Sequence, residues 1–543
     1  MIRRTLDRGG RDRRWLRLGS SVLAAALLLG GLQLGSAISG DQLAQAADED
    51  EESAEDEEYP ELSDKERAEL FAPYEEALKA GQKTAAADAL LPILDSKQAG
   101  AAHGEAWQKL GDLYREFDMD YSALLAYARA IDADPEVGKQ VIGTALDLAD
   151  ELGDGRVLGP VLARNVGVAA DKETRSRVAY LAARHNVQNG EFGVAMGMLL
   201  MVDKKSDTYI DSEALRGVVL AQQGRYNDAL APLLTAQALG KQAERGERFD
   251  NVVALNVARA YFGAGNYPRA VEYYAKVERK SDFWPEAWFE KAWSHFRAND
   301  MNGAVSVLMV HESPFYRDWY WPEADLLRAY SLFLMCKFKD ATAEIDAFDA
   351  RYQPVHAKLV ADLNGYDAMA GWNDGLALVK GQDTKVHPGV IRDYKKDERF
   401  LGAIATVDKA EEELNRLQGQ SASPFANRAI KYLRARQTNI KKEEGTRIVN
   451  TATKARDELK NMLANLKITK LDMMQFETRQ LEQASVTGEL DTGDRIGQLR
   501  KLRAKPGTRM WPWQGEYWAD EVGYYNVVSR PDCPESLRPQ VGN

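Results

Sequence analysis

The sequence predicts an all-α protein: a solenoid of antiparallel helix pairs, then a helical hairpin or coiled coil, and then a short aromatic C-terminal motif. Three observations predict this fold. From about Asp64 onward, apolar residues recur three or four positions apart, which is the spacing of an amphipathic helix. An internal repeat with a period of about 34 residues includes the segment that starts at Gly104. Strand patterns are nearly absent before roughly the last forty residues.

Composition narrows the class of protein. Of 543 residues, 45% are hydrophobic and 28% are charged, which excludes a wholly disordered chain and a multi-span membrane protein. The formal net charge of −12 argues against binding of nucleic acid through bulk charge. The two cysteines, Cys336 and Cys533, are too few for a disulfide framework or a cysteine-rich zinc site. A single disulfide between them stays open if the protein reaches an oxidising compartment.

Residues 1–46 have the layout of a bacterial secretory signal peptide. Seven arginines precede an apolar run at 22–35, and Ala44 and Ala46 provide the small residues that a cleavage site requires. The sequence therefore predicts export to the periplasm or cell envelope. The uncharged stretch 18–40 leaves open an alternative, in which the uncleaved segment anchors the protein in the inner membrane.

Residues 47–63 are predicted to form an acidic, disordered tether. Nine of the eleven residues from Asp48 to Glu58 are Asp or Glu, and none is aromatic or β-branched. Such a segment cannot collapse onto itself and stays solvated.

One copy of the repeat is specific. It contains an ordered set of large and small residues: Trp107, Leu110, Gly111, Tyr114, Ala123, Tyr127, Ala130 and Pro135. The small residues Gly111 and Ala123 let two helices approach closely, and Pro135 ends the second helix before the next begins. These eight residues match the tetratricopeptide pattern, so the chain resembles the tetratricopeptide-repeat (TPR) superfamily.

Weaker copies of the repeat follow, and Cys336 takes the place usually held by glycine in the last of them. The resemblance implies a right-handed α-solenoid over residues 64–355, with about six to eight helix pairs. It also implies a concave face that binds peptides or helices, and an adaptor role without catalysis.

The resemblance further implies which residues face the concave side. These residues are polar or small in the early repeats and become largely apolar and aromatic in the later ones. The candidate partner-binding residues among them are Arg259, Phe262, Phe289, Trp293, Phe296, Tyr330 and Phe333. Other aromatic residues already fill the core positions of these pairs, so this stripe is surplus to the core and should be covered by something. We predict that it binds a protein partner.

The chain changes character after the solenoid. Residues 356–398 are predicted to connect it to a basic helical hairpin or coiled coil at 399–505, with a break near Ser423 and Pro424. Between Arg428 and Lys470, twelve residues are basic and four are acidic. These residues form either a solvated helix face or a contact with anionic cell-wall polymer, anionic lipid or the acidic tether.

Residues 506–543 form an aromatic motif and tail. The motif contains four residues that a short segment cannot bury on itself: Trp511, Trp513, Tyr517 and Trp518. It should therefore dock on another surface, in cis or in trans. We predict that it docks on the concave aromatic stripe of the same chain.

The sequence shows no recognisable site for catalysis, cofactor binding or metal binding. No nucleotide-binding, hydrolase or zinc-protease motif occurs, and the six histidines lie far apart. The sequence therefore predicts an exported, non-enzymatic scaffold that binds protein partners in a cell-envelope assembly. Its layout also resembles exported repeat proteins of envelope machines such as gliding-motility complexes. The alternative is a cell-wall-binding or cell-division coordination protein that uses the basic helical segment.

Overall fold

The computed structural model describes residues 62–169, 171–316, 319–418, 423–487 and 514–532. Every regular element within these ranges is a helix, so the predicted all-α fold is confirmed. None of the described helices is long and apolar enough to cross a membrane. The predicted signal peptide and acidic tether lie outside the described residues.

The first half of the solenoid begins with a helix whose N-terminus is capped by two reciprocal hydrogen bonds. The backbone N–H of Glu66 donates to the Ser63 hydroxyl, and the backbone N–H of Ser63 donates to the Glu66 carboxylate. Its helices are α3 (Asp64–Lys79), α4 (Lys83–Asp95), α5 (His103–Glu116), α6 (Asp120–Ala133), α7 (Pro135–Leu152), α8 (Gly159–Arg164), α9 (Lys172–Gln188) and α10 (Phe192–Leu199). Short 3₁₀ helices η1 (Lys97–Ala102) and η2 (Val166–Val168) connect some of them.

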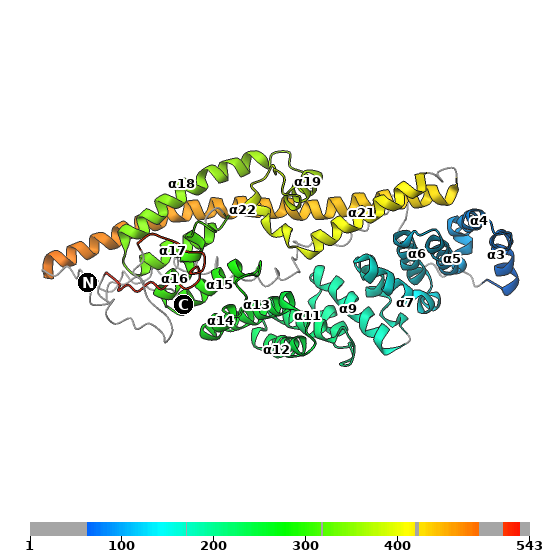
Figure 1. The fold of residues 1–543 in the computed structure, drawn as a ribbon, viewed down its shortest axis with the longest axis horizontal. Helices are drawn as coiled ribbons and strands as arrows, with labels where there is room; N and C mark the ends of the chain where they lie inside the picture. The colour runs from blue at the N-terminus through cyan, green and yellow to red at the C-terminus, as the bar shows by residue number, and fades with distance from the viewer. Residues whose placement is uncertain (1–61, 170, 317–318, 419–422, 488–513, 533–543) are drawn as a thin grey trace, which may run out of the picture.

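The second half continues the same alternation; in Figure 1 it runs along the lower side through α11–α14 and then rises on the left to α18 beside α22. Its helices are α11 (Tyr209–Gln222), α12 (Tyr226–Gln242), α13 (Glu247–Gly263), α14 (Tyr267–Tyr274), α15 (Trp284–Arg297), α16 (Met301–Glu312), α17 (Pro322–Leu334) and α18 (Phe338–Asp362). Sequential helices pack on one another throughout, which is the packing of a helical-repeat solenoid.

The turn between the two helices of a pair has a recurring backbone conformation. One residue in each turn has a positive φ, and it is Gly190, Gly224 or Gly265 in three pairs, at φ of 75–78°. Cys336 occupies the same position at φ 56°, so its predicted substitution for glycine is confirmed. This left-handed residue reverses the chain, and glycine is favoured there because it has no Cβ to clash with the backbone.

The best-matched repeat, α5 and α6, has the predicted geometry. A Cβ added at Gly111 would lie 2.7 Å from the Tyr127 ring, and Ala123 is fully buried. Pro135 is the first residue of α7, where a missing N–H costs nothing, and Asp134 caps that helix. The small residues of the motif therefore lie where the two helices touch.

The solenoid does not end where the sequence predicts. The expected boundary between residues 355 and 356 falls inside α18, which continues through Pro354 to Asp362. The predicted boundary is wrong because Leu359, which follows Pro354 in α18, is fully buried and belongs to the hydrophobic core. Beyond α18 lie α19 (Ala368–Val379), α20 (Pro388–Ile391) and η3 (Arg392–Lys395).

The predicted hairpin is formed by α21 (Glu398–Gln418) and α22 (Pro424–Thr487), and its second arm is much the longer. Helix α22 has 64 residues, about 96 Å at 1.5 Å per residue. Figure 1 shows α21 running toward the α3–α6 end and α22 returning along the whole molecule to α17 and α18. Helix α22 packs on α4 and α21 near its start and on α17, α18 and α19 farther along.

This long helix also joins two separate hydrophobic cores. Leu433 belongs to the core built from α3–α11, whereas Ile448 belongs to the core built from α13–α19. Helix α22 therefore acts as a strut between the two ends of the curved solenoid.

Candidate interaction surfaces

Helix α22 covers the repeats at the N-terminal end through aromatic contacts. Phe425 stacks on Phe117 with ring centroids 5.4 Å apart and lies 6.2 Å from Tyr114. Tyr432 lies 6.3 Å from Trp107, and the Arg129 guanidinium lies 5.0 Å from the Trp107 ring and 4.6 Å from the Tyr432 ring. Two of the residues that define the repeat, Trp107 and Tyr114, are thus part of an internal interface.

A carboxylate of α21 also binds the N-terminal repeats. Glu413, buried, accepts the backbone N–H groups of Tyr121 and Ser122 at 2.6 and 3.0 Å, and the Ser122 hydroxyl at 2.7 Å. These amides begin α6, where the helix leaves its first N–H groups without partners inside the helix. The hairpin therefore supplies the N-terminal cap of a solenoid helix about 290 residues earlier in the chain.

At the other end, α22 covers part of the predicted concave stripe. Phe476 lies edge-on to Phe333 with centroids 5.5 Å apart, and the Tyr330 and Thr469 hydroxyls are 3.4 Å apart. Nearby, Lys470 bonds Asp346 of α18 at 2.5 Å. The expectation that something covers the stripe holds for Tyr330 and Phe333, but a helix rather than the aromatic tail covers them.

The remaining stripe residues differ in accessibility. Arg259 is fully buried, with its guanidinium bound by Glu290 at 2.7–3.1 Å and Glu286 at 2.7 Å. Burial alone would lower the pKa of Arg259, but these carboxylates raise it above its ordinary value. The sequence shows the position of Arg259 but not that two acidic side chains of α15 neutralise it.

Two aromatic residues of the stripe keep part of their surface exposed between the regions that α22 covers. Phe262 packs against Tyr267, and Trp293 packs against Phe296. Phe289 and Phe296 are themselves buried. Phe262 and Trp293 are therefore partly exposed, as are Tyr330 and Phe333 beside α22, and their binding of a partner stays a prediction.

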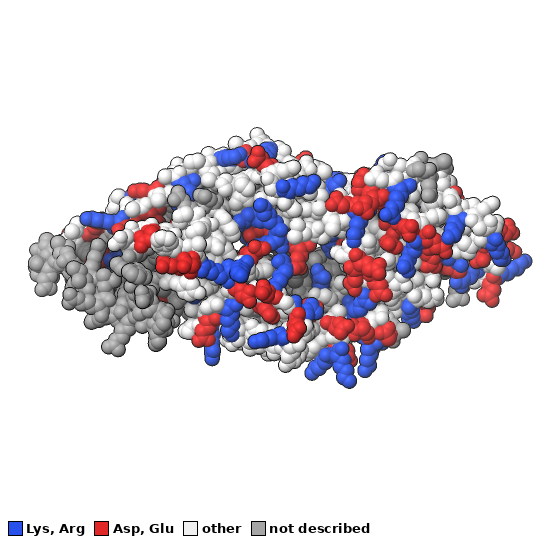
Figure 2. Space-filling model, in the orientation of Figure 1, with Lys and Arg blue, Asp and Glu red and all other residues white. Residues whose placement is uncertain are grey.

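About half of the basic residues of α22 pair with carboxylates of the same chain. At least six of the twelve between Arg428 and Lys470 form ion pairs with carboxylates, among them Arg428, Arg436, Arg447, Lys454, Arg456 and Lys470. Four of these six bind carboxylates outside α22. Arg428 pairs with Asp95 of α4, and Arg436 pairs with Asp154, which follows α7. Arg447 pairs with Asp397, which precedes α21, and Lys470 pairs with Asp346 of α18. Figure 2 shows acidic and basic side chains intermingled on this face rather than separated into large patches.

The centre of the strut is held by a buried ionic network. Arg447 binds Asp397 at 2.8 Å and also Glu444, and Arg399 binds Glu444 at 2.7 Å. Burial would raise the pKa of Glu444, but Arg399 and Arg447 outweigh it and hold that pKa below its ordinary value. The network ties α22 to the start of α21, and Arg156 extends it to the solenoid, 3.5 Å from Glu444.

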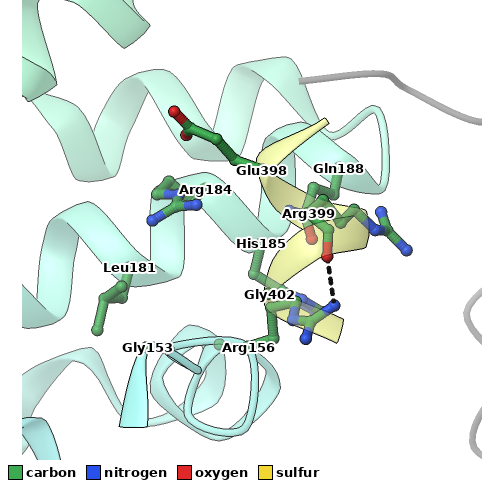
Figure 3. Close-up of a pocket in the computed structure, with 11 residues that line it drawn as sticks. Gly153, Arg156, Leu181, Arg184, His185, Gln188, Glu398, Arg399 and Gly402 are labelled. Atoms are coloured by element: carbon green, nitrogen blue, oxygen red, sulfur yellow. Dashed lines mark hydrogen bonds between the residues drawn. The ribbon is translucent and has the colours of Figure 1, made fainter. Parts of the chain in front are cut away.

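A pocket of about 210 Å³ lies beside this network, between α7–α9 and α21. Figure 3 shows Arg156 pointing toward the backbone carbonyl oxygen of Arg399, at 3.5 Å. Burial lowers the pKa of His185 on its wall. Arg156 and Arg399 both pair with Glu444, so these two charges of the pocket are compensated within the protein, and the pocket lies at the contact between the solenoid and the hairpin. Among the described residues, no group of three or more His, Cys, Asp or Glu side chains is arranged to hold a metal.

The described part of the C-terminal tail docks in cis, and its backbone is held by α16. Ser529 exchanges two hydrogen bonds with the Asn302 side chain, both at 2.9 Å, and the Val527 N–H donates to the Ser306 hydroxyl at 2.7 Å. Asn302 and Ser306 lie one turn apart on α16. The hydrogen bonds of this part of the tail come from small polar side chains of α16, which carry no sequence pattern. The predicted docking of Trp511 and Trp513 on the stripe lies outside the described residues and stays a prediction.

The predicted docking residues have different surroundings. Trp511 and Trp513 lie outside the described residues. Tyr517 is partly buried, 5.4 Å from Tyr525, whereas Trp518 is 60% exposed. Cys336 is disulfide-bonded and Cys533, the other cysteine of the chain, lies just outside the described residues.

A scan against models of known protein families finds no match, and a search of curated proteins finds none either. Among solved structures, the chain is similar to a tetratricopeptide repeat protein from Parabacteroides merdae ATCC 43184, at 16% identity and a TM-score of 0.24, covering 49% of this chain and 98% of that chain. It is also similar to the APC/C hetero-tetramer Cut9-Hcn1, at 14% identity and a TM-score of 0.18, covering 68% of this chain and 96% of that chain.

Proposed function

We propose that this chain, a helical-repeat solenoid of tetratricopeptide type, is an exported, non-enzymatic scaffold that binds a protein partner in a cell-envelope assembly. The observation that carries the proposal is that the solenoid already binds a helix of its own. Helix α22 lies against repeat aromatics at both ends, through Tyr432 on Trp107 and Phe476 on Phe333. The chemistry that holds α22 is the chemistry that would hold a helix of a partner.

The partner site in this proposal is the accessible part of the aromatic stripe. Phe262 on α13 and Trp293 on α15 are partly exposed, and Phe296 is buried directly beside Trp293. A half-buried aromatic ring with a fixed neighbour presents apolar area at little cost in conformational entropy, which is typical of an interface hot spot. An amphipathic helix or apolar segment of a protein is the class of ligand that fits.

Export and envelope location belong to the same proposal and are supported by the sequence of residues 1–46. The acidic stretch that follows would hold the solenoid away from the membrane or from the point of attachment. Sequencing of the N-terminus of protein recovered from the envelope tests this part. A new N-terminus near Ala47 supports export with cleavage, and an intact Met1 in the inner membrane supports the anchored alternative. An intact Met1 in the soluble cytosolic fraction overturns export.

The partner-binding part is tested by affinity capture from envelope fractions, with and without digestion of the cell wall. Wild-type protein is compared with the Phe262→Ala/Trp293→Ala variant, and Leu200→Ala serves as the control because Leu200 is 67% exposed far along the chain from the stripe. We expect specific proteins to survive digestion and to be lost only with the double variant. Capture that the double variant leaves unchanged contradicts the proposed site.

The same experiment addresses cell-wall binding by the basic helix, the second candidate. Lys442, Lys460 and Lys467 of α22 are exposed, and they are the residues of the basic region that would meet an anionic polymer. Capture that disappears after wall digestion and falls with charge-reversing changes at these lysines would favour this second candidate.

A further inference from the structure

The contacts of the C-terminal tail describe a second binding surface, separate from the repeat face that α22 covers. The Asn302 side chain recognises the N–H and the C=O of one residue, Ser529, which is how a side-chain amide reads an extended backbone. Ser306 accepts the N–H of Val527, two residues earlier. Neither contact depends on the tail's side chains, so these two residues of α16 would accept many sequences.

The N-terminal part of the tail segment provides apolar anchoring. Val522 is 2% exposed and is part of the core that includes Trp284 and Trp288. Gly523 lies directly on the Trp284 ring, with φ at 99°, and an added Cβ would be 2.9 Å from that ring. The surface therefore requires an apolar residue followed by glycine, and these two side-chain requirements give it selectivity.

Contacts at the two ends fix the direction of the segment. The Arg279 guanidinium donates to the Asp520 carbonyl oxygen at 2.8 Å. At the other end, the Asp532 N–H donates to the Met335 carbonyl oxygen at 2.9 Å, and Lys337 bonds the Asp532 carboxylate at 2.7 Å. The surface thus extends from the loop before α15, across α16, to the turn after α17.

We propose that this surface is a peptide-binding site, that residues 520–532 are its resident occupant, and that an extended segment of a protein partner with the same apolar-glycine pair displaces them. The argument for exchange is the chain connection. Twenty-six residues, 488–513, separate the end of α22 from Gln514, so the segment can leave without moving any described helix once the disulfide of Cys336 is reduced. This goes beyond the partner site on α13 and α15, and neither site depends on the other.

The test uses the full chain with its tail displaced by substitution. Gly523→Leu places a large side chain against Trp284, and Cys533→Ser removes the disulfide of Cys336 that would retain the tail. The probe is a fluorescein-labelled synthetic peptide of residues 518–532, and its binding is measured by fluorescence anisotropy. Asn302→Ala is added to this background as the test variant, and Asn461→Ala, an exposed asparagine on α22, as the matched control.

We expect the peptide to bind the Gly523→Leu/Cys533→Ser chain at least about tenfold more tightly than the oxidised wild type, because the tethered wild-type tail competes at high effective concentration. Asn302→Ala should weaken binding about tenfold, since two hydrogen bonds are lost, whereas Asn461→Ala should not. A peptide carrying Gly523→Leu should not bind.

Equal binding to the wild type and the displaced chain, or no effect of Asn302→Ala, would overturn the proposal. So would a dimer of the reduced wild type that forms with increasing concentration, because a second copy would then be the occupant. Circular dichroism confirms that each variant is folded. Phe262→Ala/Trp293→Ala should leave peptide binding unchanged, so failure here is distinguishable from failure of the proposed scaffold function.

Discussion

Helix α22 and the C-terminal tail both lie on the solenoid of their own chain, yet different forces hold them. Helix α22 is held by aromatic rings, by backbone contact with α19 and by buried ion pairs such as Arg447 with Asp397. The tail is held by hydrogen bonds between solenoid side chains and its backbone, by apolar packing of Val522, Tyr525 and Val527, and by the ion pair of Asp532 with Lys337.

This difference indicates that α22 is a permanent part of the fold, whereas the tail is a bound segment that another segment can replace. Removing α22 would expose apolar surface on both hydrophobic cores, which it joins. Removing the tail would expose one small apolar patch and a few polar groups that water can satisfy. Changes along α22 should therefore alter global stability, and changes under the tail should alter local protection.

The largest effect is expected at the centre of the strut. Arg447→Met leaves Glu444 and Asp397 buried with reduced compensation, so the free energy of unfolding should fall by about 3–5 kcal/mol. Urea denaturation followed by circular dichroism measures it. The control is Arg456→Met on the same helix, where the lost pair with Asp457 is solvent-exposed and should be worth less than about 1 kcal/mol. Equal effects of the two substitutions would show that the buried ion pairs of Arg447 contribute no more to stability than an exposed pair on the same helix.

The next effect concerns backbone contact between α19 and α22. A Cβ at Gly445 would overlap the carbonyl oxygen of Ala368, and no rotation of a side chain relieves a clash with backbone. Gly445→Ala should lower the free energy of unfolding by about 2–3 kcal/mol. Gly143→Ala, in α7 with open space around the added Cβ, should be neutral or stabilising by about 0.5–1 kcal/mol. A neutral Gly445→Ala would show that the helices separate at little cost.

The contact between α5 and α6 and the docking of α22 show what the sequence could and could not predict. The α5–α6 motif was predictable because Gly111 and Tyr127 meet within one repeat, so their spacing records the contact. The site where α22 docks was not, because Glu413 binds Tyr121 from about 290 residues away. The helical periodicity of α22 was visible in the sequence, but nothing local indicates which surface it covers.

The same limit applied to the candidate site. The phase of the repeat placed Arg259 on the correct helix, but its neutralisation by Glu286 and Glu290 depends on the next repeat. The aromatic content of the tail predicted docking, whereas its location depends on Asn302 and Ser306, which any surface helix could carry. Residues whose partners are close in sequence, or which form long patterns, were predictable.

A pH dependence should distinguish the contact of α22 with α17 from the rest of the strut. Burial, and then Glu458 of α22, raise the pKa of Glu323 to about 8, while Lys454 opposes this. The carboxyl is thus a weaker acid in the folded protein than in the unfolded chain, so stability is lost as pH rises from about 4.5 to 8. Glu323→Gln should stabilise the protein by about 1–2 kcal/mol at pH 8.5 and hardly at all at pH 4.5. An equal gain in stability at both pH values would mean that the negative charge of Glu323 does not destabilise the contact between α17 and α22.

The smallest effect on global stability is expected under the tail. Asn302→Ala removes two hydrogen bonds to Ser529, but the freed backbone groups lie at the surface and can bond water instead. The free energy of unfolding should therefore fall by no more than about 1 kcal/mol, in line with the roughly tenfold loss of peptide affinity expected for the same substitution. Hydrogen exchange should report a large local change, because the amides of Val527 and Ser529 would lose protection while amides of α16 keep theirs. If Asn302→Ala instead lowered global stability as much as Gly445→Ala, the tail would be part of the architecture and could not serve as an exchangeable occupant.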